Sequence, residues 1–370
     1  MQEVYSLEYV PEYLAKGGLL PTKLEDRDWD LLIRRINDKK CTPFLGAGAA
    51  YGTLPLGSKI ARDWAEEYDY PLEDNTNLTR VATYLAVKYD SMWPKDLLLK
   101  SWFKDPKPPD FKAPGEPHGA LAGLPIPVYM TTNYDSFMVQ ALRAAGKTPH
   151  RELCRWNNFT KDIPSVFDNP NGFEPTSEEP VVYHLHGHDE YVESLVLTED
   201  DYLDFLVSIS KDPELLPHHV RRRLTWTSLL FIGYSLTDWN FRVLFRGLIN
   251  SMEPTLRRIS VTVQVPPQVD GDAPAPTQAD EGVSAPTQAD GTLPASTPAN
   301  EDAPDSRQTD EDAPAPTPAD GDEPASTQAE IQEYLSNYYG KIDIRVYWGT
   351  AQNFMQELRT RWDAFKKDNG

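Results

Sequence analysis

The stretch CTPFLGAGAAY at residues 41–51 joins a short apolar run to a glycine-rich turn. The run has the length and composition of a buried strand, and it ends at Gly46-Ala47-Gly48. Because glycine has no Cβ, the backbone N–H groups of such a turn can approach a pyrophosphate closely. The G-x-G-x-x-G fingerprint is incomplete, since Tyr51 stands at its sixth position. The turn therefore fits either phosphate binding or tight packing of strand against helix.

Three further apolar runs end in the same manner, in polar or glycine-rich turns: IPVYMTTN (126–133), PVVYHLHG (180–187) and SLLFIGYS (228–235). Helical patterns lie between the runs, as in SKIARDWAEEY, SFMVQALRAAG and DYLDFLVSIS. This alternation predicts an α/β, Rossmann-like fold with a parallel sheet and helices on both faces. Ligands of such sheets bind beyond the carboxyl ends of the strands, where all four turns are expected.

The second turn, Thr131-Thr132-Asn133-Tyr134-Asp135, delivers an amide and a carboxylate just before a helix. Asn133 and Asp135 could hydrogen-bond a ribose or a carboxamide. Either residue could equally cap the helix that follows, by accepting hydrogen bonds from its first N–H groups. Position alone favours the cap.

The third turn contains His184, His186 and His188, which alternate along the chain. Alternate residues of a strand face one way, so a metal site has to be considered. The pattern departs from the H-x-H-x-D-H of binuclear hydrolases, and no metal is expected. A strand-end histidine acting as general base is favoured, because its ordinary pKa lies near neutrality. A histidine that merely satisfies hydrogen bonds is the alternative for His184 and His188.

The fourth turn follows the run SLLFI and contains Gly233 and Ser235. These two residues could close a nucleotide site. Alternatively, the segment is a turn followed by a helix that Thr237 or Asp238 caps.

Residues 266–330 differ in composition from the rest of the chain. Units such as APTQAD, ASTPAN and APTPAD recur there every ten residues. The segment holds 15 Asp and Glu against one basic residue, Arg307, and so carries −14 of the net charge of −21. It has no apolar face to bury, which predicts a disordered insert.

The folded pattern continues on both sides of this insert. A strand is expected before it at 257–265, and after it a short helix at 331–339, a strand at 341–349 and a closing helix at 350–368. We therefore predict an N-terminal extension at 1–27, a nucleotide-binding domain at 28–265, the insert at 266–330, and a strand and helix at 331–370 that complete the domain.

The net charge, the cysteine content and the apolar runs argue against nucleic-acid-binding, zinc-ribbon, secreted and membrane proteins. The acidic charge argues against direct nucleic-acid binding, and Arg221-Arg222-Arg223 is expected to be a solvated helix face or a partner contact. Cys41 and Cys154 cannot form a four-thiolate zinc site. The N-terminus does not resemble a signal peptide, and no apolar run could span a bilayer. These features predict a cytoplasmic protein without a membrane contact.

Taken in order, the four turns resemble the sirtuin superfamily, and specifically the sirtuin-like NAD-hydrolysing effectors of bacterial anti-phage defence. The segments LVLTEDDYLDFL (195–206) and FIGYSLTDWNFRVLF (231–245) look more like that branch than like protein deacylases. The resemblance covers about residues 28–265, and the strand and helix at 341–366 look like the closing element of the family.

The resemblance implies a role for each turn. It makes Asn133 and His186 catalytic. It assigns NAD binding to five glycine, alanine and serine positions and to one acid beside the nicotinamide pocket: Gly46, Ala47, Gly48, Gly233, Ser235 and Asp135. The implied reaction is hydrolysis of the nicotinamide–ribose bond of NAD.

Two departures from the deacylases favour water as the acceptor: the zinc ribbon of four cysteines is missing, and LPLGSKIARDW replaces their G-I-P-D-F-R segment. The alternatives are an NAD- or ADP-ribose-sensing module without turnover, and a protein deacylase or ADP-ribosyltransferase. The resemblance also implies a homo-oligomer and a separate activating partner, such as a HerA-type ATPase or an Argonaute. The insert either tethers such a partner or has no role.

Overall fold

The structure is a computed structural model that describes residues 24–103, 106–235, 259–265 and 328–369. The chain separates into two units. One unit comprises Met1–Pro267 with Ala329–Gly370, and the other comprises Gln268–Gln328. The second unit apart from Gln328, and residues 266–327 of the predicted insert, lie outside the described residues, as does most of the predicted N-terminal extension.

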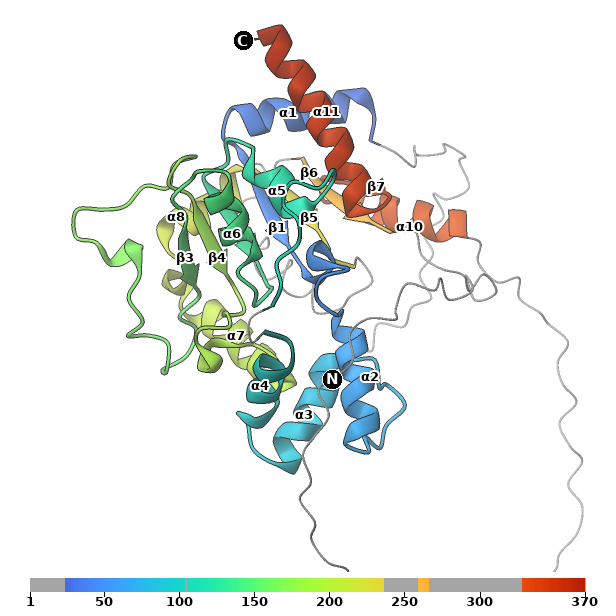
Figure 1. Cartoon of the computed structure of the whole chain (residues 1–370), viewed down its shortest axis with the longest axis vertical. Coiled ribbons are helices and arrows are strands. Elements are labelled where there is room, and N and C mark those ends of the chain that lie inside the picture. Colours follow the sequence, from blue (N-terminus) through green and yellow to red (C-terminus); the bar gives the residue numbers. More distant parts are fainter. Residues whose placement is uncertain (1–23, 104–105, 236–258, 266–327, 370) are drawn as a thin grey trace, which may run out of the picture. The chain divides into compact units, whose positions relative to one another are not determined.

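Seven parallel strands of the described chain form one sheet in the order β3-β4-β2-β1-β5-β6-β7 (Figure 1). Their bounds are Cys41–Leu45 (β1), Val128–Thr131 (β2), His150–Leu153 (β3), Val181–His184 (β4), Ser228–Ile232 (β5), Ser260–Gln264 (β6) and Ile344–Trp348 (β7). The chain fills the side of β1 that holds β2, β3 and β4, and then crosses to the other side with β5. The order therefore reverses between β1 and β5.

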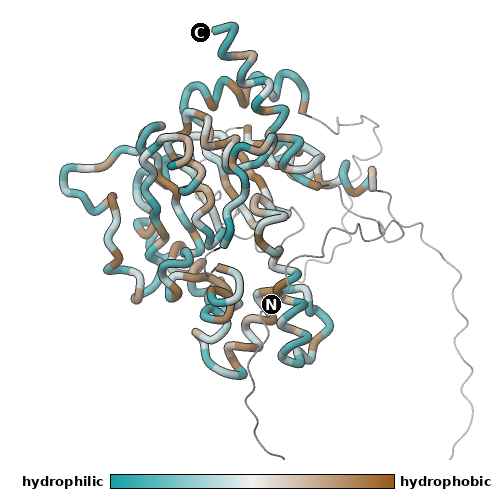
Figure 2. The backbone as a smooth tube through the Cα atoms, in the orientation of Figure 1, coloured by the Kyte–Doolittle hydropathy of each residue, from teal (hydrophilic) through white to brown (hydrophobic). Residues whose placement is uncertain are grey.

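Helices accompany the sheet along the whole described chain. Their bounds are Asp26–Asn37 (α1), Gly57–Glu67 (α2), Leu78–Lys88 (α3), Trp93–Leu98 (α4), Pro117–Ala122 (α5), Phe137–Ala144 (α6), Glu199–Lys211 (α7), His218–Trp226 (α8), Gln328–Gly340 (α10) and Ala351–Asn369 (α11). A 3-10 turn, Ala47–Ala50 (η2), follows β1 directly. Hydrophobic and hydrophilic positions alternate along these helices, as an amphipathic cover requires (Figure 2).

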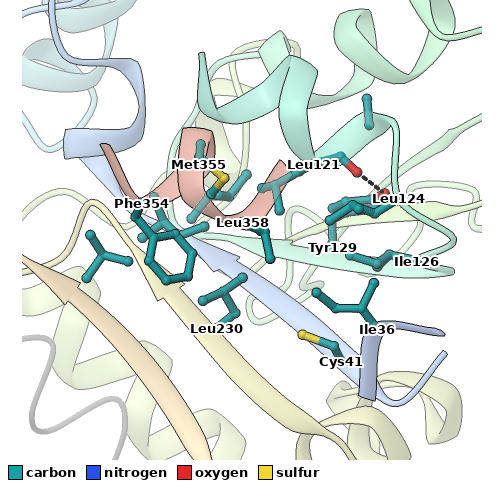
Figure 3. Packing of buried hydrophobic residues seen from close by; sticks show 14 of the residues in the cluster. Ile36, Cys41, Leu121, Leu124, Ile126, Tyr129, Leu230, Phe354, Met355 and Leu358 are labelled. Carbon is teal, nitrogen blue, oxygen red and sulfur yellow. Dashed lines mark hydrogen bonds between the residues drawn. The ribbon is translucent and has the colours of Figure 1, made fainter. Parts of the chain in front are cut away.

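Each face of the sheet has its own apolar core. Helices α1, α5, α6 and α11 pack on one face, where Cys41 and Leu230 contribute from the strands. That packing is shown in Figure 3, including the hydrogen bond from the Tyr129 hydroxyl to the Leu121 carbonyl oxygen, 3.1 Å. Helices α7, α8 and α10 pack on the other face, against Phe44 and Phe231. Neighbouring strand residues point to opposite cores, as expected in a sheet that is buried on both sides.

A third apolar cluster joins α2, α3 and α4 around Trp64 and Leu85. Lys95 of α4 connects this group to α7 through an ion pair with Asp201, in which Nζ lies 2.7 Å from Oδ1. Both side chains are largely buried, at 6% and 13% exposure. Asp201 also accepts hydrogen bonds from the backbone N–H groups of Leu197 and Thr198, and thereby fixes the start of α7.

The α/β fold predicted from the four apolar runs is confirmed, including the helices on both faces. The strand expected before the insert is present as β6, and the helix, strand and helix expected after it are present as α10, β7 and α11. Strand β3 was not predicted, because its residues HREL are too polar to show an apolar run. In the part of the chain that the structure describes, no helix is long and apolar enough to cross a membrane.

Candidate functional site

The four turns singled out in the sequence all follow carboxyl ends of strands in the sheet. The turn at Gly46 follows β1, Asn133 follows β2, His186 follows β4 and Gly233 follows β5. Strands β1 and β5 are neighbours, and the order of the sheet reverses between them. A topological switch point of this kind is where parallel α/β sheets bind their ligands. The turns of β1 and β5 therefore define the candidate site.

The glycines of these two turns pack directly against one another. The Gly46 N–H donates to the Ile232 carbonyl oxygen (2.9 Å), and the Gly48 N–H donates to that of Gly233 (3.0 Å). A Cβ on Gly46 would lie 2.8 Å from the Gly233 oxygen. Gly233 itself has φ +79°, and a Cβ there would lie 2.2 Å from the Ala49 nitrogen. Close packing between the turns explains these glycines, as one interpretation of the sequence had it.

Two of the three N–H groups expected to hold a pyrophosphate are thus already used within the protein. The third belongs to Ala47, which is exposed and begins η2. No described residue accepts a hydrogen bond from its N–H. Ala47 N is therefore the donor of this turn that a ligand can reach.

Tyr234 ties the three central strands together just past β5. Its hydroxyl donates to the carbonyl oxygen of Leu45 at the end of β1 (2.8 Å), and lies 2.8 Å from the hydroxyl of Thr132 after β2. Gln264 at the end of β6 donates to the Tyr234 carbonyl oxygen (2.9 Å). The carboxyl ends of β1, β2, β5 and β6 are therefore connected through Tyr234.

The side chain of Asn133 also connects two of these strand ends, those of β1 and β2. Its Nδ2 donates to the Gly46 carbonyl oxygen (3.0 Å), and its backbone N–H donates to the Thr131 hydroxyl (2.9 Å). The residue is half-buried. With Nδ2 occupied, the amide presents Oδ1 as an acceptor. The structure thus brings Asn133, Gly46, Gly48 and Gly233 together.

Asp135 lies just before α6 and is 5% exposed. Its Oδ1 accepts the backbone N–H of Phe137, the first residue of the helix (2.9 Å). This is the helix-capping role that the sequence offered as the alternative to ligand binding. Ser235 is exposed after β5, whereas Thr237 and Asp238 lie outside the described residues.

His184, the last residue of β4, has a hydrogen bond at each ring nitrogen. Nδ1 lies 2.9 Å from the Asn133 carbonyl oxygen, and Nε2 lies 3.3 Å from Arg151 Nε. Burial, and then the Arg151 charge, hold the pKa of His184 well below its usual range. The residue is therefore neutral near pH 7, and it is not positioned to ligate a metal.

His186 points into a different environment. Its ring packs edge-on against Tyr202 (5.0 Å between centroids) and Phe205 (5.1 Å), both on α7. Nε2 is buried and has no hydrogen-bond partner among the described residues. Burial lowers the pKa of His186 to about 3. No contact joins its side chain to Asn133, so the two residues expected to be catalytic are not directly linked.

His188, the third histidine of the turn, is also buried. Its Nδ1 accepts the backbone N–H of Glu190 (3.3 Å), and burial lowers its pKa to about 3. The described residues contain no group of three or more His, Cys, Asp or Glu side chains that could hold a metal ion.

Arg151 is the residue of this region that the sequence did not single out. It lies on β3, at 10% side-chain exposure, and contacts His184, the Tyr134 carbonyl oxygen, Asp189 and Glu190. Only the placement of β3 beside β4 brings it there. The one signal in the sequence is an arginine inside a polar strand, which specifies no partner.

The similarity to known proteins extends over three of these turns. A SIR2-like domain model matches residues 127–284, which include the turns after β2, β4 and β5. The NAD(+) hydrolase ThsA of Cytobacillus dafuensis is 25% identical over 207 residues, covering 56% of this chain and 37% of that protein. The ThsA of Enterococcus faecium is 34% identical over 125 residues, covering 34% of this chain and 23% of that protein. A third ThsA, from Bacillus cereus, is 30% identical over 143 residues.

The chain therefore spans less than two fifths of the length of the curated relatives it matches. The matched region contains β2, β4 and β5 with their turns, and the turn after β1 packs against it. Over residues 127–284 the chain is therefore similar to SIR2-like domains, and this stretch contains three of the four turns at the carboxyl ends of the strands.

Proposed function

We propose that this protein hydrolyses NAD at the nicotinamide–ribose bond and releases nicotinamide and ADP-ribose. The observation that carries the proposal is the hydrogen bond from Asn133 Nδ2 to the Gly46 oxygen, which joins the turns of β1 and β2 beside the switch point. Relatives named NAD(+) hydrolase support the choice of substrate.

The pyrophosphate of NAD is proposed to bind at the exposed first residue of η2, Ala47. Ala47 N is the N–H group of the turn without a partner in the described chain, and it is the first N–H group of the 3-10 turn η2, at an exposed residue. A pyrophosphate oxygen at this position would accept a hydrogen bond there. Gly46 and Gly48 act by letting the turn pack closely on Gly233, rather than by donating to the ligand.

Asn133 is proposed to position the sugar or the attacking water. Since Nδ2 is held by Gly46, Oδ1 is oriented and can accept a hydrogen bond from a ribose hydroxyl or from water. Asp135 uses Oδ1 for the helix cap, which leaves Oδ2 to accept a hydrogen bond from the amide of nicotinamide.

In the reaction, the bond between C1′ of the ribose and the pyridinium nitrogen breaks, and its electron pair neutralises the nitrogen. A water oxygen bonds to C1′ and loses a proton. The transition state resembles an oxocarbenium ion, as in glycoside hydrolysis. His186 is proposed as the acceptor of that proton, directly or through a ribose hydroxyl, at its unpaired Nε2.

The environment of His186 sets a condition on this role. With its pKa lowered to about 3 by burial, the ring is a weaker base than free imidazole at pH 7. A polar substrate group at Nε2 would relieve the burial and raise the proton affinity. We therefore expect His186 to act as a base only after the substrate, or an activating partner, has changed its contact with Tyr202 and Phe205.

The same observation supports a second candidate function. A histidine that stays neutral and packed among aromatic side chains would suit a module that binds NAD or ADP-ribose without turnover. In that case Asn133 and the turn of β1 would serve recognition alone.

Nicotinamide release from NAD separates the two functions. The purified chain is assayed alone and after co-expression with the genes that neighbour it, together with Asn133→Ala. Gln140→Ala is the matched control, because Gln140 lies on the adjacent helix α6 and its amide donates one hydrogen bond, to the hydroxyl of Ser136 just before that helix. Release by wild type and Gln140→Ala but not by Asn133→Ala supports hydrolysis.

Each other outcome contradicts the proposal. NAD binding without release, in both preparations, supports the sensing module. Release that depends on an added acetyl-peptide supports a deacylase, and equal release by Asn133→Ala removes that residue from the mechanism.

Following the resemblance, we further propose that the protein depletes NAD in the cytoplasm of phage-infected bacteria, as a homo-oligomer with a separate activator. A HerA-type ATPase is the first candidate for the activator. Phage titres on cells that express wild type or Asn133→Ala test the defence role, since protection by both proteins would exclude NAD depletion as its cause.

A further inference from the structure

Arg151 and His184 lie directly behind Asn133, and the proposed reaction assigns neither of them a role. His184 Nδ1 is 2.9 Å from the Asn133 carbonyl oxygen. On the other side of the ring, Nε2 is 3.3 Å from Arg151 Nε. Three residues from β3, β4 and the turn after β2 therefore form a continuous chain of hydrogen bonds.

The chemistry of the two ends decides the tautomer of His184. A carbonyl oxygen can only accept, so Nδ1 must carry the proton that reaches Asn133. A guanidinium can only donate, so Nε2 must be the unprotonated nitrogen that faces Arg151. A second proton on the ring would confront Arg151 Nε–H with another N–H. The contacts thus allow one neutral tautomer, with hydrogen on Nδ1.

Arg151 also holds the next residue of the same turn. One of its terminal nitrogens, Nη2, donates to the Tyr134 carbonyl oxygen (3.0 Å) and lies 2.8 Å from Asp189 Oδ1, while Nη1 lies 3.0 Å from Glu190 Oε1. The two acids neutralise the guanidinium, which is 10% exposed. Two consecutive carbonyl groups are therefore fixed by one arginine, directly at Tyr134 and through His184 at Asn133.

We propose that Arg151 and His184 are positioning residues, which lock the backbone of Asn133 so that its side-chain amide stays on the Gly46 oxygen with Oδ1 toward the substrate. This inference rests on the proposed function. It gives the first histidine of the His-Leu-His-Gly turn a task distinct from that of His186: a fixed hydrogen-bond donor in place of a base.

The tautomer can be tested without any turnover. Two-bond ¹H–¹⁵N correlation spectra of the NAD-free protein near pH 7 report which nitrogen of a histidine carries hydrogen, and His184→Asn assigns the signal. We expect the Nδ1–H form of His184 in wild type, and a mixture of tautomers in Arg151→Ala. An Nε2–H form or an imidazolium in wild type overturns the proposal, whether or not the protein hydrolyses NAD.

Kinetics test the positioning itself. In His184→Asn the side-chain amide nitrogen takes the place of Nδ1, so the donor to Asn133 is kept. In His184→Ala it is lost. We expect His184→Ala to lower kcat by about 10- to 100-fold with little change in KM, because misplacement of a reacting group acts on the chemical step. His184→Asn should recover most of that loss.

His188→Ala is the matched control, since His188 is equally buried and its ring lies 5.1 Å from that of His184, but it does not contact Asn133. If His184→Asn and His184→Ala lose kcat equally, or if His188→Ala loses as much as His184→Ala, the effect is one of packing and the proposal fails. Absence of nicotinamide release from wild type would refute the proposed function instead, and the tautomer spectra would still decide the hydrogen-bond chain.

Discussion

The side-chain amide of Asn133 donates to the carbonyl oxygen of Gly46 across 3.0 Å, and so connects the turn after β2 to the turn after β1. Neither turn alone specifies a nucleotide site, since one is also a helix start and the other is tightly packed. Because the two turns are connected beside the switch point of the sheet, we interpret them together as a site for a nucleotide.

Replacement of Asn133 by aspartate tests this connection. The substitution keeps the size of the side chain but turns the donor into a carboxylate oxygen that faces the Gly46 oxygen. We expect a loss of about 1–3 kcal/mol in the free energy of unfolding, because two acceptors are brought together in a half-buried place. Asn133→Ala should lose only about 0.5–1.5 kcal/mol. Urea denaturation at pH 7 measures both, and equal stability of Asn133→Asp and wild type would mean that the contact with Gly46 is not made in solution.

The pKa of His186 leads to a prediction about pH. The ring is neutral when folded, with a pKa of about 3, whereas the unfolded chain has an ordinary value near 6.5. Between these values the unfolded state binds the extra proton, so the stabilising contribution is complete above pH 6.5 and is lost as the pH falls. The slope amounts to about 1.4 kcal/mol per pH unit for one such histidine.

His186→Phe should remove this slope while keeping the aromatic contacts to Tyr202 and Phe205. It also removes the buried, unpaired Nε2, so we expect equal or greater stability at pH 7, together with the loss of NAD hydrolysis. Urea denaturation at pH 7, 6 and 5 gives the comparison. His184 and His188 contribute in the same direction in both proteins, and Asp189, whose pKa burial raises, titrates in the opposite sense, so the difference between the variants isolates His186. An identical pH dependence in the two proteins would show that the ring is not buried as described.

Gly233 and Gly146 offer a test of the packing between the turns. Both have positive φ, +79° and +82°, but a Cβ on Gly146 would meet nothing within 4 Å. Gly146→Ala should therefore cost only the backbone strain, about 1–2 kcal/mol. Gly233→Ala would also force a Cβ against the Ala49 nitrogen, and we expect a larger loss or failure to fold. Thermal unfolding of the two variants compares them, and equal midpoints would refute the tight packing.

The buried ion pair between Lys95 and Asp201 should be energetically important, unlike the exposed pair between Lys59 and Asp63. Lys95→Met leaves Asp201 buried without its cation, which typically costs about 3–5 kcal/mol. Lys59→Met removes a pair whose side chains are 53% and 42% exposed, and should change stability by less than about 0.5 kcal/mol. Chemical denaturation measures both, and a small effect at Lys95 would argue against its burial.

The sequence predicted the positions of the site residues better than their contacts. Apolar runs that end in polar turns placed Gly46, Asn133, His186 and Gly233 at strand ends, because the length of a strand fixes where its carboxyl end falls. The contacts depend on which strands are neighbours, and no local pattern encodes that order. The role of Arg151 follows from β3 lying beside β4, and could not be predicted for this reason.

Two alternatives that the sequence left open are resolved in the structure, one by a local contact and one by tertiary packing. Asp135 could cap a helix or bind a ligand, and its Oδ1 caps α6. Gly46 and Gly48 could make room for a phosphate or for a neighbouring turn, and their Cβ positions are filled by Gly233 and Tyr234. For the two glycines, local sequence establishes only that the residue is small, whereas the partner is supplied by the distant turn after β5.

Strands β6 and β7 are parallel neighbours, so the connection between them has to lead from the carboxyl end of β6 to the amino end of β7, and α10 is its described part. A hairpin turn would couple the length of its connection to the alignment of the two strands, but a return of this kind does not. Each doubling in length of such a connection costs only about 0.6 kcal/mol in closure entropy. Short units can consequently be duplicated or deleted here over evolutionary time while the sheet is inherited unchanged. The connection between β6 and β7 is therefore also a suitable place to insert a reporter domain.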